Sequence, residues 1–216
     1  MSQETSAPEA PIGLLLDFGG VFTSPLLPAV LAFEKREGLP KGACIAALYQ
    51  DEEGVRLTSD LERGAISQTE WNEAAAVKLG VAPDNLMGRI FADLRPEPVM
   101  IAAAAAAQRA GIKVGILSNS VGLAPWDLYD GYELEALYDS VVISEHHRMR
   151  KPDSDLFRIA LKELGLTAEE CVFVDDTEAY VKAAEALGFA GVHATDPQQT
   201  VAQLSKLFGV ELADAH

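Results

Sequence analysis

The 216-residue sequence contains little cysteine, little basic charge and no long apolar run. Its two cysteines, Cys44 and Cys171, provide no disulfide framework, and such usage is typical of a reducing compartment. Seventeen basic residues face 33 acidic ones, and the net charge of −16 argues against nucleic acid or an anionic membrane as a partner. No apolar stretch reaches the about 18 residues that a membrane-spanning helix needs, and residues 1–11 lack the basic and apolar parts of a signal peptide. We therefore expect a cytoplasmic protein.

Hydrophobic residues make up 49% of the chain, which is enough to bury the core of one domain with an insertion. We expect the core domain to comprise residues 12–23 and 98–208, with a helical insertion over 24–97. Residues 1–11 and 209–216 are expected to be flexible tails. The composition leaves the oligomeric state open between a monomer and a homodimer.

The segment IGLLLDFGGVFTS, residues 12–24, carries the most specific signal in the chain. Its apolar start is typical of a strand covered on both faces, and Asp17 is expected to be the last residue of that strand. In open α/β sheets, ligands bind outside the carboxyl ends of the strands, and Gly19 and Gly20 would let the backbone approach an anion or a metal. Taken alone, the segment fits an ordinary turn better than a site.

Three later segments repeat this combination of an apolar run, polar residues and a helix. IKVGILSNS places Ser118 and Asn119 after a strand, and CVFVDD ends a strand with Asp175 and Asp176. Between them, Lys151 precedes a helix whose apolar residues recur at helical spacing. Right-handed crossovers would keep the strands parallel and bring these polar residues to one edge of the sheet. The sequence therefore predicts a Rossmann-like, doubly wound α/β fold.

The stretch over residues 24–97 differs, because it reads as helix after helix without a convincing strand. One helix is expected to end at Gly38. A second is expected to begin with a capping box at Ser67 and to end at Gly80. A third is expected within residues 83–94. This stretch therefore predicts a helical layer beside the α/β core.

Three carboxylates at one edge of a sheet repel one another unless a cation joins them. Mg²⁺ prefers oxygen ligands and often shares its site with substrate phosphate, so it is the natural partner of such a cluster. Lys151, the Ser118 hydroxyl and the backbone N–H groups after Ser118 could bind a phosphoryl group. Asp17 would then attack phosphorus and form an aspartyl-phosphate that water hydrolyses.

Together, the four motifs resemble the haloacid dehalogenase superfamily of hydrolases, most closely its phosphatases with a small helical cap inserted after the first motif. The resemblance spans residues 12–195. The stretch from Glu62 to Trp71 resembles the cap of phosphatases related to the amino-terminal domain of soluble epoxide hydrolases. The resemblance implies a Mg²⁺-dependent phosphohydrolase that acts on a small phosphorylated metabolite.

The resemblance also implies a role for each motif residue. The residues that would hold the metal are Asp17, which is also the nucleophile, Gly19 through its backbone carbonyl, Asp176 directly and Asp175 through water. The groups that would bind and stabilise the phosphoryl group are Ser118 and Lys151. The further residues that would contact the substrate are Gly20, Asn119, His147 and Arg148.

One departure from the family pattern concerns proton transfer. Most phosphatases of this family have a second Asp two residues after the nucleophile, where this chain has Gly19. That Asp is the usual general acid/base, and a positioned proton donor contributes about 10²–10⁴-fold to a rate. We therefore expect good leaving groups, such as those of anomeric sugar phosphates, acyl phosphates and diphosphates, to be favoured. A histidine near Lys151 could replace the missing group, although His147 and Arg148 fit a solvated loop equally well.

Two other functions remain open at this stage. A binding or regulatory protein could keep the phosphate pocket without useful turnover, and Gly19 is the main support for that reading. Haloacid dehalogenation uses the same fold without a metal, but Asp175 and Asp176 argue against it, because uncompensated carboxylates beside a developing halide are costly. We interpret the aromatic and acidic segment over residues 126–140 as a connector rather than a wall of the site, and Tyr180 as a packing residue.

Overall fold

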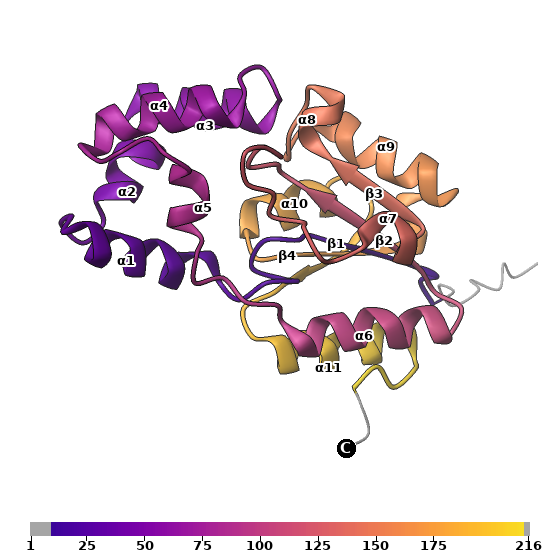
Figure 1. Ribbon diagram of the computed structural model, residues 1–216. Helices are drawn as coiled ribbons and strands as arrows, with labels where there is room; N and C mark the ends of the chain where they lie inside the picture. The colour runs from indigo at the N-terminus through magenta and orange to yellow at the C-terminus, as the bar shows by residue number, and fades with distance from the viewer. Residues whose placement is uncertain (1–9, 214–216) are drawn as a thin grey trace, which may run out of the picture.

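A five-stranded parallel sheet lies at the centre of the computed structural model, which describes residues 10–213 (Figure 1). The strands follow the order β3-β2-β1-β4-β5, and every neighbouring pair is parallel. They are β1 (Gly13–Leu16), β2 (Lys113–Ser118), β3 (Ser140–Ile143), β4 (Cys171–Asp175) and β5 (Ala190–His193). The predicted doubly wound α/β fold is thereby confirmed.

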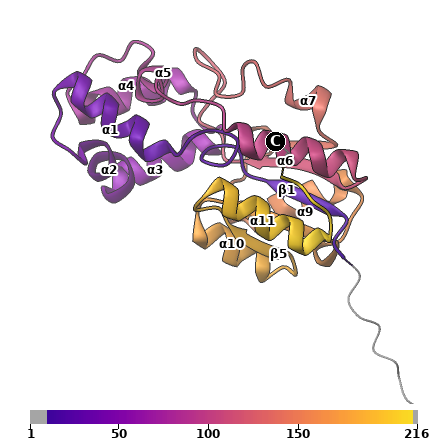
Figure 2. The ribbon, with the colours of Figure 1, turned by 90° about the horizontal axis from the view of Figure 1, so that it is seen from below.

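Helices cover both faces of the sheet. On one face, α6 and α11 lie side by side and share a core with Leu14 and Leu16 of β1 (Figure 2). On the other face, α9 and α10 pack around Leu15. Successive side chains of a strand point to opposite faces, so adjacent leucines serve the two cores. These helices are α6 (Pro98–Arg109), α9 (Ser154–Leu164), α10 (Glu178–Glu185) and α11 (Pro197–Phe208), and the short ones are α7 (Leu134–Leu137), α8 (Ser144–His147) and the 3₁₀ turn η2 (Ala168–Glu170).

The strand register brings the polar motif residues to one edge of the sheet. β1 ends at Leu16, one residue earlier than predicted, but the N–H of Asp17 still donates to the carbonyl of Val174 at 2.8 Å. Ser118 and Asp175 are the last residues of β2 and β4, the two neighbours of β1. The carboxyl end of β1 therefore lies between those of its neighbours, as the crossover argument predicts.

The helical insertion forms a separate layer beside the carboxyl ends of the strands (Figure 1). Its elements are α1 (Leu26–Glu37), α2 (Ala43–Ile45), the π-helical turn η1 (Ala46–Gln50), α3 (Glu52–Glu62), α4 (Gln68–Leu79) and α5 (Leu86–Ile90). Gly38 and Gly80 end α1 and α4 in the left-handed conformation, with φ of 71° and 69°. Ser67 and Glu70 form the capping box at the start of α4. The predicted helix limits at Gly38, Ser67 and Gly80 are confirmed.

Some elements of the fold differ from the sequence-based expectation. Helix α3 was not predicted, because Gly54 weakens its helical pattern. A Cβ at Gly54 would lie 1.9 Å from the carbonyl oxygen of Ala47, so the glycine allows α3 to pack closely on η1. Strand β3 was not predicted, because its first residue, Ser140, lies in the segment interpreted as a connector. Helix α5 has five residues and occupies only part of the expected range 83–94.

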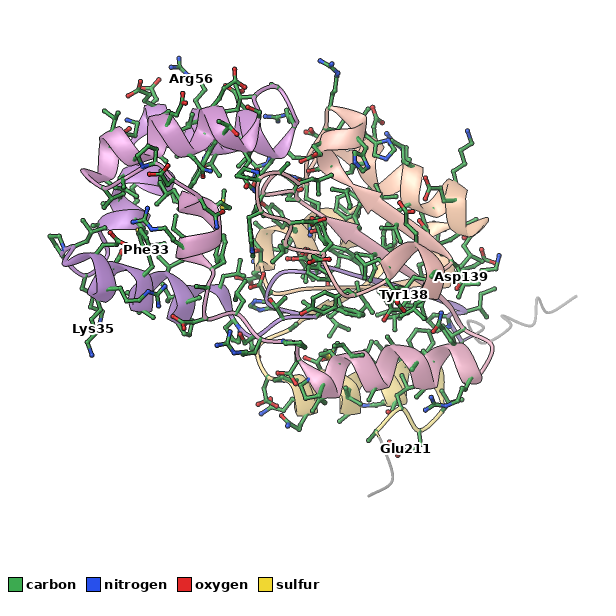
Figure 3. The ribbon with its side chains drawn as sticks, viewed as in Figure 1. Phe33, Lys35, Arg56, Tyr138, Asp139 and Glu211 are labelled. Carbon is green, nitrogen blue, oxygen red and sulfur yellow. The ribbon has the colours of Figure 1, made fainter. Side chains whose placement is uncertain are left out.

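The insertion has its own apolar core. Phe33 points from α1 into this core and is fully buried, whereas Lys35 and Arg56 point away from it (Figure 3). Glu34 is also buried, and its two carboxylate oxygens accept backbone N–H groups of the following turn at 2.7 and 2.8 Å. The buried carboxylate is thus hydrogen-bonded on both oxygens, and it fixes the turn that follows α1.

The end of the described chain packs on the core. Leu212 is fully buried, and its N–H donates to the Ser205 hydroxyl at 3.0 Å. Ordered packing therefore continues beyond the expected boundary at residue 208. The rest of the expected tails, residues 1–9 and 214–216, lies outside the described residues. Between residues 10 and 213, no helix is long and apolar enough to cross a membrane.

Candidate active site

Three carboxylates meet where β1 and β4 end. Asp17, Asp175 and Asp176 each offer an oxygen, and these atoms all lie within 4.8 Å of one another. Burial, together with the charge of Asp175, raises the pKa of Asp17 to about 8. Burial and the same neighbour also raise the pKa of Asp176. An all-oxygen donor set with this much uncompensated negative charge fits a hard divalent cation such as Mg²⁺.

Lys151 is the positive charge inside this cluster. Its ammonium group lies 2.8 Å from Asp17 Oδ1 and 2.6 Å from Asp175 Oδ2, and its side chain is 1% exposed. Burial alone would lower the pKa of Lys151, but Asp17 and Asp175 outweigh it and raise the pKa. The lysine is therefore held charged beside the expected nucleophile.

Asn119 holds the backbone of Lys151 in place. Its side-chain oxygen accepts the N–H of Lys151 at 2.7 Å, and its side-chain nitrogen donates to the carbonyl of Lys151 at 3.3 Å. The Asn119 side chain thus positions the backbone of the lysine, and its contact with a substrate stays a prediction.

The two glycines after Asp17 have different surroundings. Gly20 has φ +78°, and a Cβ there would lie 2.3 Å from Asp176 Oδ2, so only glycine allows this close approach. Gly19 adopts no positive φ, and a Cβ there would meet nothing nearer than a methyl carbon of Leu26 at 3.4 Å. Position 20 therefore requires glycine, but position 19 has room for a side chain.

Ser118 faces the site from the end of β2 and is 1% exposed. The hydroxyl of Tyr129 donates to Ser118 Oγ at 2.9 Å, and the Ser118 hydroxyl itself donates to the carbonyl of Asn119 at 3.4 Å. Tyr129 is buried, and its ring packs edge-on against Phe18, the residue after Asp17, with 4.8 Å between ring centres. Part of the segment interpreted as a connector, residues 126–140, therefore lines the site. The aromatic residues clustered in this segment were the sequence feature that could have indicated its place beside the site.

Residues 13–188 match the family model of the haloacid dehalogenase-like hydrolases, and this match covers most of the chain. The chain belongs to this family. The match spans both the α/β core and the helical insertion, and it agrees with the observed fold.

Named relatives of this hydrolase match shorter stretches. A sesquiterpene phosphatase of Aspergillus oryzae is 39% identical over 84 residues, which are 39% of this chain and 38% of the relative. A glyceraldehyde 3-phosphate phosphatase of Methanocaldococcus jannaschii is 31% identical over 100 residues, or 46% and 44% of the two chains. The matched stretches thus span less than half the length of these curated relatives.

Solved structures share the fold over nearly the whole chain. A haloacid dehalogenase family enzyme of Bacteroides thetaiotaomicron superposes with a TM-score of 0.65 at 20% identity, over 93% of this chain and 99% of the other. A variant of that enzyme in complex with magnesium and inorganic phosphate gives a TM-score of 0.64, at 20% identity, over 84% and 92% of the chains. At this identity the likeness concerns the fold alone.

In this hydrolase, Tyr129→Phe is expected to lower kcat about 2- to 10-fold, because the Ser118 hydroxyl loses one neutral hydrogen bond that positions it. Tyr132→Phe is the matched control. Tyr132 packs on the same Phe18 ring, but its hydroxyl makes no hydrogen bond within residues 10–213. Steady-state rates with acetyl phosphate, together with melting temperatures, test the prediction. An equal loss in both variants would indicate packing rather than positioning.

His147 and Arg148 lie at the end of α8. Arg148 is exposed, adopts φ 56° and caps the helix, and His147 is half-buried. Among the described residues, no hydrogen bond or ion pair joins either side chain to the carboxylate cluster. Their contact with a substrate stays a prediction.

A polar network links the helical insertion to Lys151. Arg150 Nε lies 2.5 Å from Glu62 Oε2 of α3, and another guanidinium nitrogen of Arg150 donates to the hydroxyl of Tyr180 at 2.8 Å. Tyr180 in turn accepts a hydrogen bond from Asn119 at 3.4 Å. Burial raises the pKa of Glu62 to about 7, and Arg150 opposes that shift. The Tyr180 hydroxyl thus connects Arg150, which contacts the insertion, with Asn119, which holds Lys151. The interpretation of Tyr180 as only a packing residue was therefore incomplete.

Gln68, at the start of α4, fastens the insertion to the loop after β2. Its amide nitrogen donates to the carbonyls of Val121, Gly122 and Trp126 at 2.8, 3.1 and 2.9 Å. Its oxygen accepts the N–H of Trp126 at 3.0 Å. The side chain is buried, so these loop groups have little access to water as a substitute partner. Sequence reasoning missed this residue, because its partners lie more than 50 positions away.

Gln68→Ala is expected to reduce the free energy of unfolding by about 3 kcal/mol, because it leaves several buried backbone groups without partners. Gln199→Ala, at an exposed position of α11, is the matched control and should have little effect. Urea unfolding of both variants measures the difference. Equal stability of the two would show that water replaces the Gln68 contacts.

Proposed function

We propose that this hydrolase is a Mg²⁺-dependent phosphohydrolase that acts on a small phosphorylated metabolite through an aspartyl-phosphate. The single observation that carries the proposal is the position of Lys151 between Asp17 and Asp175, with Asp176 in the same cluster. Such a site combines a nucleophile, a fixed cation and ligands for a metal. The phosphatase names of the two relatives from Aspergillus oryzae and Methanocaldococcus jannaschii support the same reaction class.

The hydrogen bonds of the carboxylates support distinct roles. Asp175 Oδ2 binds Lys151 and Oδ1 accepts the N–H of Thr177 at 2.8 Å, so both of its oxygens have partners. Asp176 uses Oδ1 for the Thr177 hydroxyl, at 3.2 Å, and keeps Oδ2 available. We assign Asp17, Asp176 and the carbonyl of Gly19 as direct ligands and Asp175 as a ligand through water. When bound, Mg²⁺ would neutralise the carboxylates and the phosphoryl oxygens.

The nucleophile is held so that one oxygen can react. Asp17 Oδ1 accepts from Lys151 and from the N–H of Phe18, at 2.8 and 2.7 Å, which leaves Oδ2 free to attack phosphorus. Lys151 and the Ser118 hydroxyl would bind the phosphoryl oxygens. The phosphorus–oxygen bond to the leaving group breaks as the Asp17–phosphorus bond forms. Water then cleaves the aspartyl-phosphate and returns Asp17 to its carboxylate form.

The absence of a side chain at Gly19 shapes the proposed specificity. No carboxyl group at that position can protonate the leaving oxygen, so good leaving groups are favoured over simple alkoxides. Sugar phosphates with an anomeric phosphate, acyl phosphates and diphosphates meet this condition.

We further propose that residues 24–97 act as a cap over a core of residues 12–23 and 98–208, and that the protein works in the reducing cytoplasm. The separate core of the insertion and its contacts through Gln68 support the first point. Cys44 and Cys171, both free and buried, support the second.

Phosphate release from acetyl phosphate, glucose 1-phosphate, a nucleoside monophosphate and a prenyl diphosphate, with Mg²⁺ or with EDTA, tests the proposal. We expect turnover that EDTA abolishes and Mg²⁺ restores, fastest for the better leaving groups. Phosphate binding without turnover of any substrate would instead favour the binding protein that Gly19 leaves as the second candidate.

A further inference from the structure

A narrow apolar pocket, the cap slot, lies between the insertion and the loop after β2. Its walls are mainly apolar side chains of the insertion: Val30, Leu48, Leu61, Met87, Ile90 and Phe91. Ser120 and Val121 close the slot on the core side. These two residues directly follow Ser118 and Asn119, so the slot adjoins the candidate active site.

The dimensions of the cap slot restrict what can enter it. It contains about 440 Å³ of free space counted out to its open mouth, but only about 30 Å³ is wide enough to admit the centre of a water molecule. A slender chain fits such a space better than a hydrated sugar ring. A hydroxyl group placed there without a partner would also lose its water at a cost.

Most polar groups that line the slot already have partners. The Thr58 hydroxyl donates to the carbonyl of Leu48 at 3.4 Å, the Ser120 hydroxyl bonds Glu145, and Glu62 pairs with Arg150. They therefore offer little to a polar ligand.

Two buried atoms of the lining have no hydrogen-bond partner among the described residues: Glu62 Oε2, which faces Arg150 only as an ion pair, and the indole nitrogen of Trp71. Trp71 is 2% exposed and lines the slot, yet its indole N–H has no acceptor within the described residues. A buried indole N–H usually finds a partner. This unpaired donor indicates that the slot is built to receive an atom from outside the chain.

We propose that the cap slot binds the leaving group of the substrate, and that the substrate is a phosphate compound of a slender, largely apolar alcohol or acid. This inference rests on the proposed phosphohydrolase function. The phosphoryl group would lie on Ser118 and Lys151, and the apolar chain would pass Ser120 and Val121 into the insertion.

Acyl phosphates of increasing length test the slot, because acetyl, butanoyl, hexanoyl and octanoyl phosphate share one leaving group chemistry. We expect kcat/KM to rise about fourfold for each methylene that the slot buries. If acetyl phosphate is cleaved and all members of the series react at equal rates, the assignment of the slot to the leaving group is wrong. The proposed phosphohydrolase function would not be contradicted.

Two valine variants locate the effect. Val30→Phe fills the slot and should remove the gain with chain length. Val77→Phe makes the same change at a side chain that is 84% exposed, and it should keep the gain. The assignment of the slot would be contradicted if both variants lost the increase of kcat/KM with chain length, or if both kept it.

Binding of phosphonates separates this inference from the reaction itself. In the presence of Mg²⁺, octylphosphonate should bind more tightly than methylphosphonate and should shift the indole N–H resonance of Trp71. If no acyl phosphate is cleaved but octylphosphonate binds more tightly, the slot assignment is supported and the proposed reaction is contradicted. Equal binding of both phosphonates would overturn the slot.

Discussion

Replacing Asp17 with Asn is expected to abolish phosphate release, with a fall on the order of 10⁶-fold, to the background rate. The amide cannot form the aspartyl-phosphate, and the free oxygen of Asp176, Oδ2, is assigned to the metal rather than to phosphorus. Asp175 has both oxygens engaged, by Lys151 and by the N–H of Thr177. The measurement is single-turnover phosphate release from acetyl phosphate with Mg²⁺.

The same variant should fold at least as stably as the wild type without metal. Burial and the charge of Asp175 raise the pKa of Asp17, so holding the charged form of Asp17 in this cluster costs stability. A neutral amide of the same size removes that cost, and Lys151 keeps Asp175 as its partner. Asp130→Asn, at an exposed position, controls for the change in net charge. Turnover by a folded Asp17→Asn variant would refute the covalent mechanism, while loss of turnover with retained phosphate binding would support it.

The edge of the sheet that carries the candidate site could be predicted from the sequence, because its residues lie at points fixed by local patterns. Asp17, Ser118 and Asp175 each end an apolar run, and parallel strands bring such ends together whatever the intervening segments do. The glycines after Asp17 were recognised in the same way. What the sequence could not distinguish is that Gly20 needs a positive φ next to Asp176, whereas Gly19 does not.

The residues that position the site act through contacts between segments distant in the sequence. No local sequence pattern could therefore predict their roles. Tyr129 reaches Ser118 from a segment without clear periodicity, and Gln68 contacts a loop that belongs to the other part of the molecule. Arg150 lies next to Lys151 in the sequence, but its pairing with Glu62 depends on how the insertion docks. Strand β3 was missed because it begins at Ser140, at the end of the segment that was interpreted as a connector.

These long-range contacts have a common consequence for function. Glu62, Gln68 and the walls of the cap slot all belong to the insertion, and they meet the loops that carry Ser118 and Lys151. On the proposed function, the core would provide the chemistry, while the insertion would determine the space that the leaving group occupies. Substrate preference would then be encoded in residues that the family motifs do not include.

Introducing the missing carboxyl group, Gly19→Asp, is expected to increase turnover of a simple alkyl phosphate by about 10²–10⁴-fold. The position can accept a side chain, since its φ is not positive and a Cβ would meet only Leu26, at 3.4 Å. The new carboxyl group could protonate the departing alkoxide. Acetyl phosphate has a good leaving group and should gain little, so the ratio of the two rates is the quantity to measure.

Gly19→Asn is the matched control, because it has the same shape without a proton to transfer at neutral pH. Gly20→Asp should disrupt the site instead, because a Cβ there would lie 2.3 Å from Asp176 Oδ2. If Asp and Asn at position 19 gave equal rates on the alkyl phosphate, proton transfer would not be what this chain lacks. A gain confined to Gly19→Asp and to poor leaving groups would show that one absent carboxyl group sets the chemical selectivity of the enzyme.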